Sequence, residues 1–320
     1  MDPELAPEGA AAACAELEEV LAGLASSPKR LPCKLLYDAR GSALFERITQ
    51  LPEYYCARVE LSILREHARE MARRLGPERL LVELGSGSSR KTRVLLDQLM
   101  RPVAYVPIDI SPSALEASSH ALRARYPRLD VRPLVADYTR EFRVPRRASD
   151  ASGKVSVFFP GSTLGNFEPQ EAVAFLRRVR ELCGPDQRWL IGVDTPKERR
   201  VLEPAYDDSE GVTAAFNRNI LHVLNREYGA DFHPERFAHQ AIWKPEQSYV
   251  EMQLVSRRAQ VVSVAQRAVR FDAGEPIITE HCHKYSREAF QRLAHQAGFE
   301  VERVWLDPEE RFSLHLLSAQ

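Results

Sequence analysis

The feature that most constrains this fold is an alternation of short apolar segments with helix-length intervals, which begins near residue 80. This rhythm is typical of a parallel sheet, because each strand needs a crossover connection, usually a helix, before the next strand can run the same way. The pattern is carried by five segments: Leu80–Leu84, Val103–Ile110, Val131–Val135, Val155–Phe159 and Trp189–Val193. We therefore expect an α/β fold with an open sheet.

The C-terminal end breaks this rhythm. An amphipathic helix is predicted over Ser286–Gly298, and two apolar segments follow it, Phe299–Leu306 and Phe312–Leu317. The turn Asp307-Pro308-Glu309-Glu310 joins them, which indicates an antiparallel pair. Five parallel strands with a terminal hairpin outline the seven-stranded, Rossmann-like sheet of class I methyltransferases, whereas a dinucleotide-binding fold normally finishes parallel.

Two portions of the chain stand outside the predicted sheet. One precedes it and contains a helix with Leu44, Ile48 and Leu51 on one face. The other contains a predicted helix, Ala214–Tyr228, and several predicted strands. These strands lie near Ser248–Val255, Gln260–Val264 and Ile277–Cys282. We expect residues 60–198 plus 286–320 to bind the cofactor, and residues 1–59 plus 199–285 to form a second, discontinuous α+β substrate domain.

A glycine turn follows the first predicted strand. In Gly85-Ser86-Gly87 the backbone can turn tightly and approach a ligand, and the next helix would direct free N–H groups at that ligand. The turn departs from the dinucleotide fingerprint, because Arg90 stands where G-x-G-x-x-G demands a third glycine. S-adenosylmethionine is therefore a better candidate cofactor than a dinucleotide.

Polar residues also end the next strands. Asp109 suits the ribose hydroxyls, while Asp137 and Tyr138 suit the adenine amino group and ring. Asn166, in the glycine-containing loop after the fourth strand, can donate to a carboxylate. Each of these polar groups also has a plain interpretation as a helix cap. Their shared place at the carboxyl ends of parallel strands favours ligand binding, because ligands of open α/β sheets bind there.

The composition excludes several function classes. The 44 basic and 45 acidic residues nearly cancel and the arginines lie among glutamates, so no nucleic-acid partner is expected. The acidic N-terminus lacks the features of a signal peptide, and no apolar run is long enough to span a membrane. Five scattered cysteines without C-x-x-C spacing favour free thiols and a cytoplasmic location. A monomer without a membrane partner is expected.

A series of short motifs runs through both predicted domains. They are Tyr37-Asp38 with Gly41-Ser42, Leu51-Pro52-Glu53-Tyr54-Tyr55, Glu83-Leu84-Gly85-Ser86-Gly87, Gly161-Ser162-Thr163-Leu164-Gly165-Asn166, Ala205-Tyr206-Asp207-Asp208, Phe216-Asn217-Arg218-Asn219 and Thr279-Glu280. In this order they resemble the histidine Nα-methyltransferases of ergothioneine biosynthesis, from about residue 30 to the C-terminus. The resemblance implies three successive methyl transfers from S-adenosylmethionine to the α-amine of L-histidine, giving hercynine.

The resemblance also implies roles for the matched residues. The S-adenosylmethionine site would comprise Gly85, Ser86, Gly87, Lys91, Asp109, Asp137 and Tyr138. The histidine site would comprise Tyr37, Tyr54, Gly161, Asn166, Tyr206, Met252, Glu280 and Cys282. Within it we expect Tyr37 to orient the amine, and Asn166 and Tyr206 to anchor the carboxylate. These three are the expected catalytic set.

Alternation along an extended segment gives a separate reason to pair two of these residues. Glu280 and Cys282 should share one face, while His281 and His283 point the other way. A carboxylate beside a short polar group can contact both nitrogens of an imidazole. The same alternation separates the histidines from the cysteine, so a metal site in this triplet is not expected and no metal cofactor is predicted.

Four alternatives stay open at this point. The family pattern has serine at the position of Cys282, and a thiol is the weaker hydrogen-bonding group, so the substrate can be another free amino acid such as tryptophan, tyrosine or a modified histidine. Met252 can be an ordinary core residue. A nicotinamide-dependent oxidoreductase and an inactive S-adenosylmethionine-binding module are the alternatives from other classes.

Overall fold

One mixed sheet of seven strands forms the larger part of the protein. The computed structural model describes residues 8–140, 142–147, 150, 153–184 and 186–320. The strand order is β12-β13-β6-β5-β2-β3-β4, and β13 runs antiparallel to both of its neighbours while β2 to β6 are parallel. The strands are β2 (Leu80–Leu84), β3 (Ala104–Asp109), β4 (Leu134–Val135), β5 (Val155–Phe159), β6 (Gln187–Asp194), β12 (Phe299–Leu306) and β13 (Phe312–Ala319). This topology confirms the predicted class I methyltransferase sheet.

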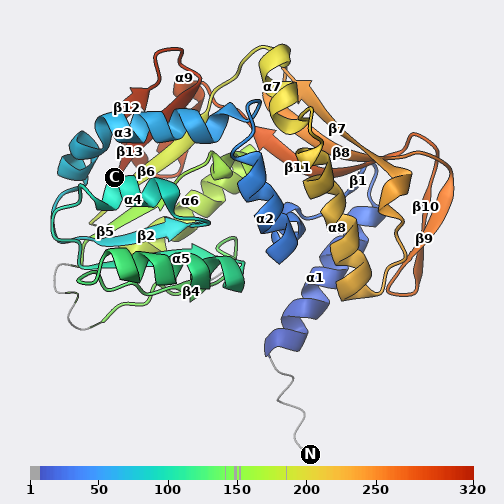
Figure 1. Cartoon of the computed structure of the whole chain (residues 1–320), viewed down its shortest axis with the longest axis horizontal. Coiled ribbons are helices and arrows are strands. Elements are labelled where there is room, and N and C mark those ends of the chain that lie inside the picture. Colours follow the sequence, from blue (N-terminus) through green and yellow to red (C-terminus); the bar gives the residue numbers. More distant parts are fainter. Residues whose placement is uncertain (1–7, 141, 148–149, 151–152, 185) are drawn as a thin grey trace, which may run out of the picture.

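Helices cover both faces of this sheet (Figure 1). They are α3 (Tyr55–Leu75), α4 (Arg90–Leu96), α5 (Pro112–Arg125), α6 (Pro169–Cys183) and α9 (Arg287–Gln296). Along β2 the side chains alternate between two cores: Leu81 joins the core that contains residues of α3, whereas Leu80 and Val82 join the core that contains residues of α6 and α9. A strand buried on both faces explains the continuous apolar run in its sequence.

A second, four-stranded sheet lies to the right in Figure 1, with strand order β1-β11-β8-β7. Its strands are β1 (Lys29–Arg30), β7 (Phe237–Lys244), β8 (Tyr249–Ser256) and β11 (Pro276–His283), and a separate hairpin comprises β9 (Gln260–Val264) and β10 (Arg267–Phe271). The helices on this side are α1 (Glu8–Ala25), α2 (Ala39–Ile48), α7 (Arg199–Tyr206) and α8 (Val212–Tyr228), with 3-10 turns η1 (Cys33–Tyr37) and η3 (Pro234–Arg236). α8 packs on α2, η1, β7 and β8, so the N-terminal and central portions of the chain contact one another.

The structure differs from the sequence-based expectations in several details. β4 is shorter than Val131–Val135, so Asp137 lies in the turn beyond the strand. Leu51 follows the end of α2 instead of lying on it. The sequence did not predict β7 or β10. The expected division of the chain into two domains stays a prediction, and its boundary at residue 60 falls inside α3.

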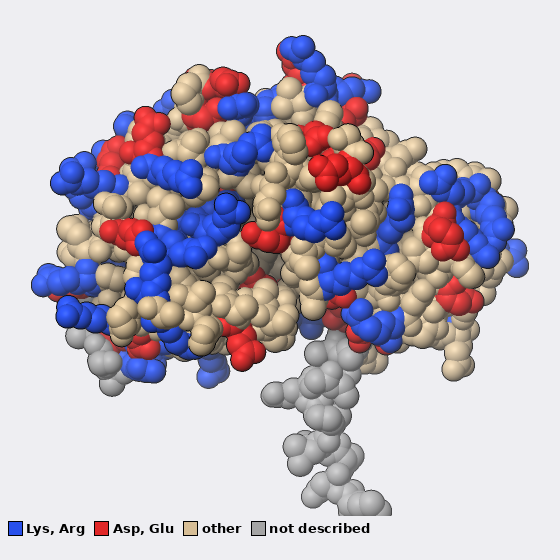
Figure 2. All heavy atoms as spheres, in the orientation of Figure 1, with Lys and Arg blue, Asp and Glu red and all other residues tan. Residues whose placement is uncertain are grey.

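Charged residues of both signs are interspersed over the face shown in Figure 2. That view also shows a hollow where the two sheets' units meet. Within the described part of the chain, no helix is long and apolar enough to cross a membrane.

Candidate active site

The glycine turn at the end of β2 has the backbone shape that its sequence predicts. Gly85 and Gly87 both have positive φ values, +71° and +46°, which side chains rarely adopt. The amides of Gly85 and Ser86 donate to the carbonyl oxygen of Ile108 in β3, at 2.8 and 3.1 Å. A Cβ atom on Gly85 would lie 3.7 Å from the ring of Tyr138. The turn therefore lies against the end of β3 and beside Tyr138, a residue that was expected to contact the cofactor.

The acids expected at this site have local partners as well. Asp109 accepts from the amides of Gly87 and Ser111 at 2.9 and 3.0 Å, and Asp137 accepts from the amide of Thr139 at 2.9 Å. These are contacts within turns, and neither acid is the N-cap of a helix, since the N-cap of α5 is Ser111. Each carboxylate keeps further acceptor capacity. The Ser86 hydroxyl is buried without a hydrogen-bond partner among the described residues. A buried unpaired hydroxyl in this turn fits a polar ligand such as S-adenosylmethionine.

A buried acidic side chain, that of Glu83, lies just before the glycine turn and connects it to neighbouring elements. Glu83 of β2 is only 1% exposed and accepts from Thr92 Oγ1 at 2.7 and 2.6 Å, and also from the Tyr105 hydroxyl. Burial raises the pKa of Glu83 to about 8, against the opposing effect of these hydrogen bonds. The carboxyl group therefore connects β2, β3 and the start of α4.

All eight residues expected at the substrate site line one pocket. Segments from both halves of the chain meet here: η1, α2, the start of α3, the loop after β5 with its turn η2 (Thr163–Asn166), α7, α8, β8 and β11. The lining residues are Tyr37, Phe45, Ile48, Tyr54, Gly161, Ser162, Thr163, Asn166, Ala205, Tyr206, Thr213, Phe216, Met252, Glu280 and Cys282. Met252 is 1% exposed, so it is a core residue and a pocket residue at once.

Glu280 is the acidic group of this pocket. Its Oε1 atom accepts from the side-chain amide nitrogen, Nδ2, of Asn166 at 2.9 Å and from the Tyr37 hydroxyl at 3.4 Å, while Oε2 accepts from the Cys282 thiol at 3.1 Å. Burial raises the pKa of Glu280 to about 7, although the contact with Cys282 opposes this shift. Glu280 and Cys282, which were expected to contact the imidazole, therefore lie in direct contact with Asn166, which was expected to bind the substrate's α-carboxylate.

Three tyrosines surround the pocket. Burial raises the pKa of each of the hydroxyls of Tyr37, Tyr54 and Tyr206 well above its ordinary value. The rings pack edge to face, with ring centroids 6.1 Å apart for Tyr54 and Tyr206 and 5.5 Å apart for Tyr37 and Phe216. The hydroxyls therefore remain protonated donors near neutral pH, and the pocket wall is aromatic.

Glu60 of α3 connects the two sites, and sequence reasoning missed it. Its side chain is fully buried, and its Oε1 and Oε2 atoms accept from the amide of Gly161 at 3.0 and 2.9 Å. Lys91, an expected cofactor residue, places its Nζ atom 2.5 Å from Glu60 Oε2. A Cβ atom on Gly192 would overlap Glu60, so this glycine leaves the space for the carboxylate. An acid within the apolar stripe of α3 was the available sequence signal.

The loop that carries Asn166 also approaches β11 closely. A Cβ atom on Gly165 would lie 2.5 Å from the carbonyl oxygen of His283, a separation that real Cβ atoms do not show. Glycine at this position therefore lets two main chains touch, which brings Asn166 to Glu280.

The opposite face of β11 carries a second polar cluster. His281 lies between two carboxylates, with Nδ1 2.6 Å from Glu168 Oε1 and Nε2 3.0 Å from Glu251 Oε2, and His283 Nε2 lies 3.3 Å from Glu168 Oε2. Ligand atoms of Glu168, His281 and His283 lie within 4.8 Å of one another. Burial opposes the charged form, but the two carboxylates raise the pKa of His281 overall. These are the contacts of an imidazolium paired with carboxylates, and the expected absence of a metal stays a prediction.

The fold and the glycine turn define the chain as a class I methyltransferase. A family model described as "Histidine-specific methyltransferase, SAM-dependent" matches residues 16–319, and the chain belongs to this family. Histidine N-alpha-methyltransferases of Mycolicibacterium smegmatis and Mycobacterium tuberculosis are 40% and 39% identical to it, over 93% of this chain and of each relative. Ergothioneine biosynthesis protein 1 of Neurospora crassa is 30% identical over 91% of this chain and 33% of that longer protein. These findings confirm the predicted family and its use of S-adenosylmethionine.

Proposed function

We propose that this protein transfers methyl groups from S-adenosylmethionine to the α-amine of free L-histidine, three times in succession, and so forms hercynine for ergothioneine biosynthesis. Family membership supports the reaction, and the printed names of the relatives support the substrate and the pathway. One observation carries the assignment of the substrate to this chain. A buried carboxylate, Glu280, and a thiol, Cys282, share one wall of a pocket that also contains hydrogen-bond donors for an amino acid.

At the imidazole end, Glu280 accepts from a ring N–H. The Cys282 thiol donates to Glu280 and so fixes the orientation of this carboxylate. An apolar side chain in the same place would leave the buried carboxylate without that partner, which favours histidine over aromatic amino acids that lack ring nitrogens. Met252 packs against the ring.

With substrate bound, Asn166 and Tyr206 donate to the α-carboxylate, and Tyr37 orients the amine; in the free enzyme the Asn166 side-chain amide and the Tyr37 hydroxyl donate to Glu280 instead. The hydroxyl protons needed for this are present, because the pKa values of both tyrosines are raised by burial. Tyr54 helps to enclose the substrate. Holding the amine in one orientation supplies much of the acceleration expected of such an enzyme.

S-adenosylmethionine supplies an electrophilic methyl carbon, and the amine must bring a free electron pair to it. The pocket tyrosines hold their own protons, so they do not serve as ready bases in the free enzyme. The amine therefore loses its proton to water before each transfer. As methyl groups accumulate, the tyrosine faces accept the growing quaternary ammonium through cation–π attraction, worth about 0.5–2 kcal/mol.

Mass spectrometry of a reaction with isotope-labelled S-adenosylmethionine tests this proposal. Histidine should gain three labelled methyl groups on its α-nitrogen, while tryptophan and tyrosine, offered side by side at equal concentration, should gain few or none. Methylation of another amino acid in preference to histidine would overturn the substrate. Stabilisation by S-adenosylmethionine without any methylated product would overturn the enzyme.

The remaining expectations carry over as parts of this proposal. Residues 60–198 plus 286–320 bind the methyl donor, and residues 1–59 plus 199–285 bind the amino acid; residues 1–7 lie outside the described part of the chain. All five cysteines are free thiols in the structure, which supports a cytoplasmic setting. We expect a monomer, which size-exclusion chromatography with light scattering tests.

A further inference from the structure

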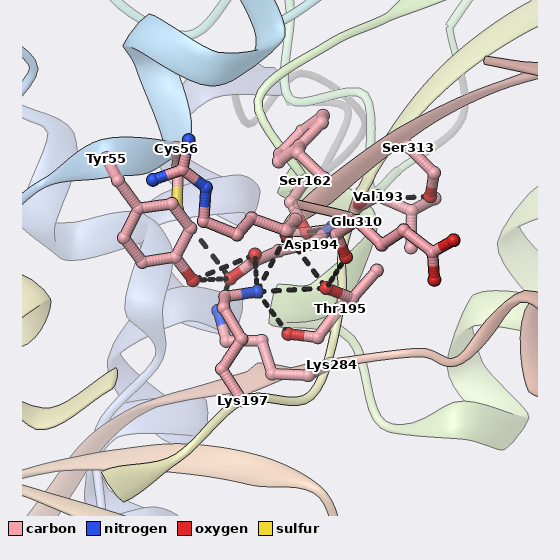
Figure 3. Close-up of polar contacts among 12 residues, drawn as sticks. Tyr55, Cys56, Ser162, Val193, Asp194, Thr195, Lys197, Lys284, Glu310 and Ser313 are labelled. Carbon is pink, nitrogen blue, oxygen red and sulfur yellow. Dashed lines mark hydrogen bonds and ion pairs between the residues drawn. The ribbon is translucent and has the colours of Figure 1, made fainter. Parts of the chain in front are cut away.

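Behind the substrate pocket lies a group of buried charges that the proposed mechanism does not use (Figure 3). Lys284, directly after β11, is 1% exposed at its side chain, and its Nζ atom lies 2.8 Å from Oδ2 of the fully buried Asp194 at the end of β6. Lys197 places its Nζ atom 2.7 Å from Oδ1 of the same carboxylate. Tyr55 also donates to Asp194, at 2.9 and 2.8 Å. One buried carboxylate thus faces two ammonium groups.

Lys284 also contacts a residue of the pocket itself. Its Nζ atom donates to the Tyr206 hydroxyl oxygen at 2.6 Å and lies 4.6 Å from the centre of that ring. An ammonium group has donors and no acceptor, so the tyrosine oxygen must accept in this hydrogen bond. The tyrosine's own proton is then left to point to a different acceptor. The contact therefore fixes which way the hydroxyl donates.

The backbone holds this lysine in place from two sides. The Lys284 amide donates to the carbonyl oxygen of Ser248 at 2.7 Å, and the Ser248 hydroxyl donates back to the Lys284 carbonyl oxygen at 2.7 Å. The amide of Tyr285 donates to the carbonyl oxygen of Asp194 at 3.0 Å. Because the main chain on both sides of the ammonium is anchored, little conformational entropy is lost when a ligand binds.

We propose that Lys284 is a positioning residue for the methyl acceptor: its ammonium group orients the Tyr206 hydroxyl as a donor to the substrate's α-carboxylate and places a positive charge behind that carboxylate. This inference rests on the proposed function, because it requires an amino acid with a free carboxylate in the pocket. Hydrogen bonds to a charged acceptor in a site screened from water are strong, so this contact should contribute to recognition of the carboxylate.

The chain provides a matched control in Lys197. Both lysines pair with Asp194, but the Lys197 ammonium donates to the backbone oxygens of Thr195 and Arg311 and lies 4.8 Å from the Tyr55 ring centre. The contact with the Tyr206 hydroxyl is made by Lys284. Lys284→Met and Lys197→Met therefore remove the same charge from the same carboxylate. They differ in the contact with the pocket tyrosine.

The test measures KM and kcat for L-histidine and for L-histidinamide, whose carboxylate is replaced by an uncharged amide. For each variant we take the ratio of the KM for histidinamide to the KM for histidine. Comparing this ratio between variants cancels the difference in KM that the two substrates already show with the wild-type enzyme. In Lys284→Met we expect KM for histidine to rise roughly 10- to 100-fold and KM for histidinamide to rise much less, because the neutral group gains little from a nearby charge. Lys197→Met should leave the ratio of the two KM values unchanged.

Lys284 acts through Tyr206 in this proposal, so the effects of substituting these two residues on the histidine KM must be coupled. In a Tyr206→Phe background, Lys284→Met should change the histidine KM much less than it does in the wild-type background. If Lys284→Met does not fold, Lys284→Gln keeps an N–H donor without the charge and takes its place in the same measurements. It should also lower the preference for histidine over histidinamide.

A purely structural role would show itself differently. If both lysine variants lower the melting temperature and the activity on both substrates alike, without a change in the ratio of KM values, Lys284 serves only to pair with Asp194 and the inference is overturned. A wild-type enzyme that methylates histidine is required for either outcome. Failure of the wild-type enzyme to do so would refute the proposed function instead.

Discussion

Replacing Glu60 should affect both stability and substrate binding, because this one carboxylate supports both sites. In Glu60→Ala, the amide of Gly161 loses its acceptor, and Lys91 loses a partner at 2.5 Å. An orphaned buried N–H costs about 1–3 kcal/mol. Breaking a buried ion pair costs about 3–5 kcal/mol, but the Lys91 side chain is 23% exposed and can turn to water, so we take a value near the lower limit.

We therefore expect Glu60→Ala to lower the free energy of unfolding by about 4–6 kcal/mol, because the orphaned N–H group and the broken ion pair both contribute. Glu60→Gln should cost only about 3 kcal/mol, because its amide oxygen still accepts from Gly161 and only the ion pair with Lys91 is lost. Freed from its acceptor, the Gly161 loop shifts, so KM for histidine should rise more in the alanine variant than in the glutamine variant.

Urea-induced unfolding followed by circular dichroism measures the first quantity, and steady-state kinetics with each substrate varied measures the second. The difference between the two variants is the decisive comparison. If Glu60→Gln is as unstable as Glu60→Ala, the charge and not the hydrogen bond to Gly161 carries the effect. If both variants unfold within about 0.5 kcal/mol of the wild type, the reasoning from burial is wrong.

Four further predictions concern the pocket and the glycine turn. Asn166→Ala should raise KM for histidine roughly 10- to 100-fold with little change in S-adenosylmethionine binding by calorimetry, and an unchanged histidine KM would contradict the anchoring role. Glu280→Ala should reduce the ratio of kcat/KM for histidine over phenylalanine at least about 10-fold, because phenylalanine has no ring nitrogen, and a retained ratio would exclude imidazole recognition by this carboxylate. Cys282→Ser should lower the histidine KM by about 2- to 5-fold, since a hydroxyl hydrogen-bonds more strongly than a thiol, whereas a higher KM would show that the thiol is the better fit. The Glu83 carboxyl has a pKa of about 8 in the folded protein against an ordinary value of 4.5, so the unfolded chain releases this proton first as pH rises. The free energy of unfolding therefore falls by up to about 1.4 kcal/mol per pH unit between these two values. Urea unfolding at pH 6 and pH 8 should show a smaller decrease in this free energy for Glu83→Gln than for the wild type.

Much of the fold was predictable from the sequence because the central strands are buried on both faces. The predicted segments Leu80–Leu84, Val155–Phe159 and Phe299–Leu306 coincide with strands of the structure. The sequence failed to predict β7, in which the inward positions include His239. This histidine is buried because Asn217 and the carbonyl oxygen of Tyr206 satisfy its nitrogens at 2.9 and 2.8 Å, and both partners are distant in the sequence.

The candidate site divides in the same way. The eight substrate residues that the family resemblance implies line one pocket, so the resemblance located this wall of the site correctly. Glu60, Lys284 and Glu168 were missed, since their partners lie far away along the chain: 101 residues separate Glu60 from Gly161, and 78 separate Lys284 from Tyr206. Contacts between residues so far apart in the sequence become visible only in the folded structure.

The contact between Gly165 and His283 has a consequence for the whole catalytic geometry. There, main chain meets main chain, and no side chain can grow or shrink to alter the separation. Asn166 follows directly on one side, and Lys284 on the other. The separation between the Asn166 loop and β11 is therefore set by backbone dimensions, so substitutions elsewhere in the protein can accumulate without changing the spacing of these two walls of the substrate pocket.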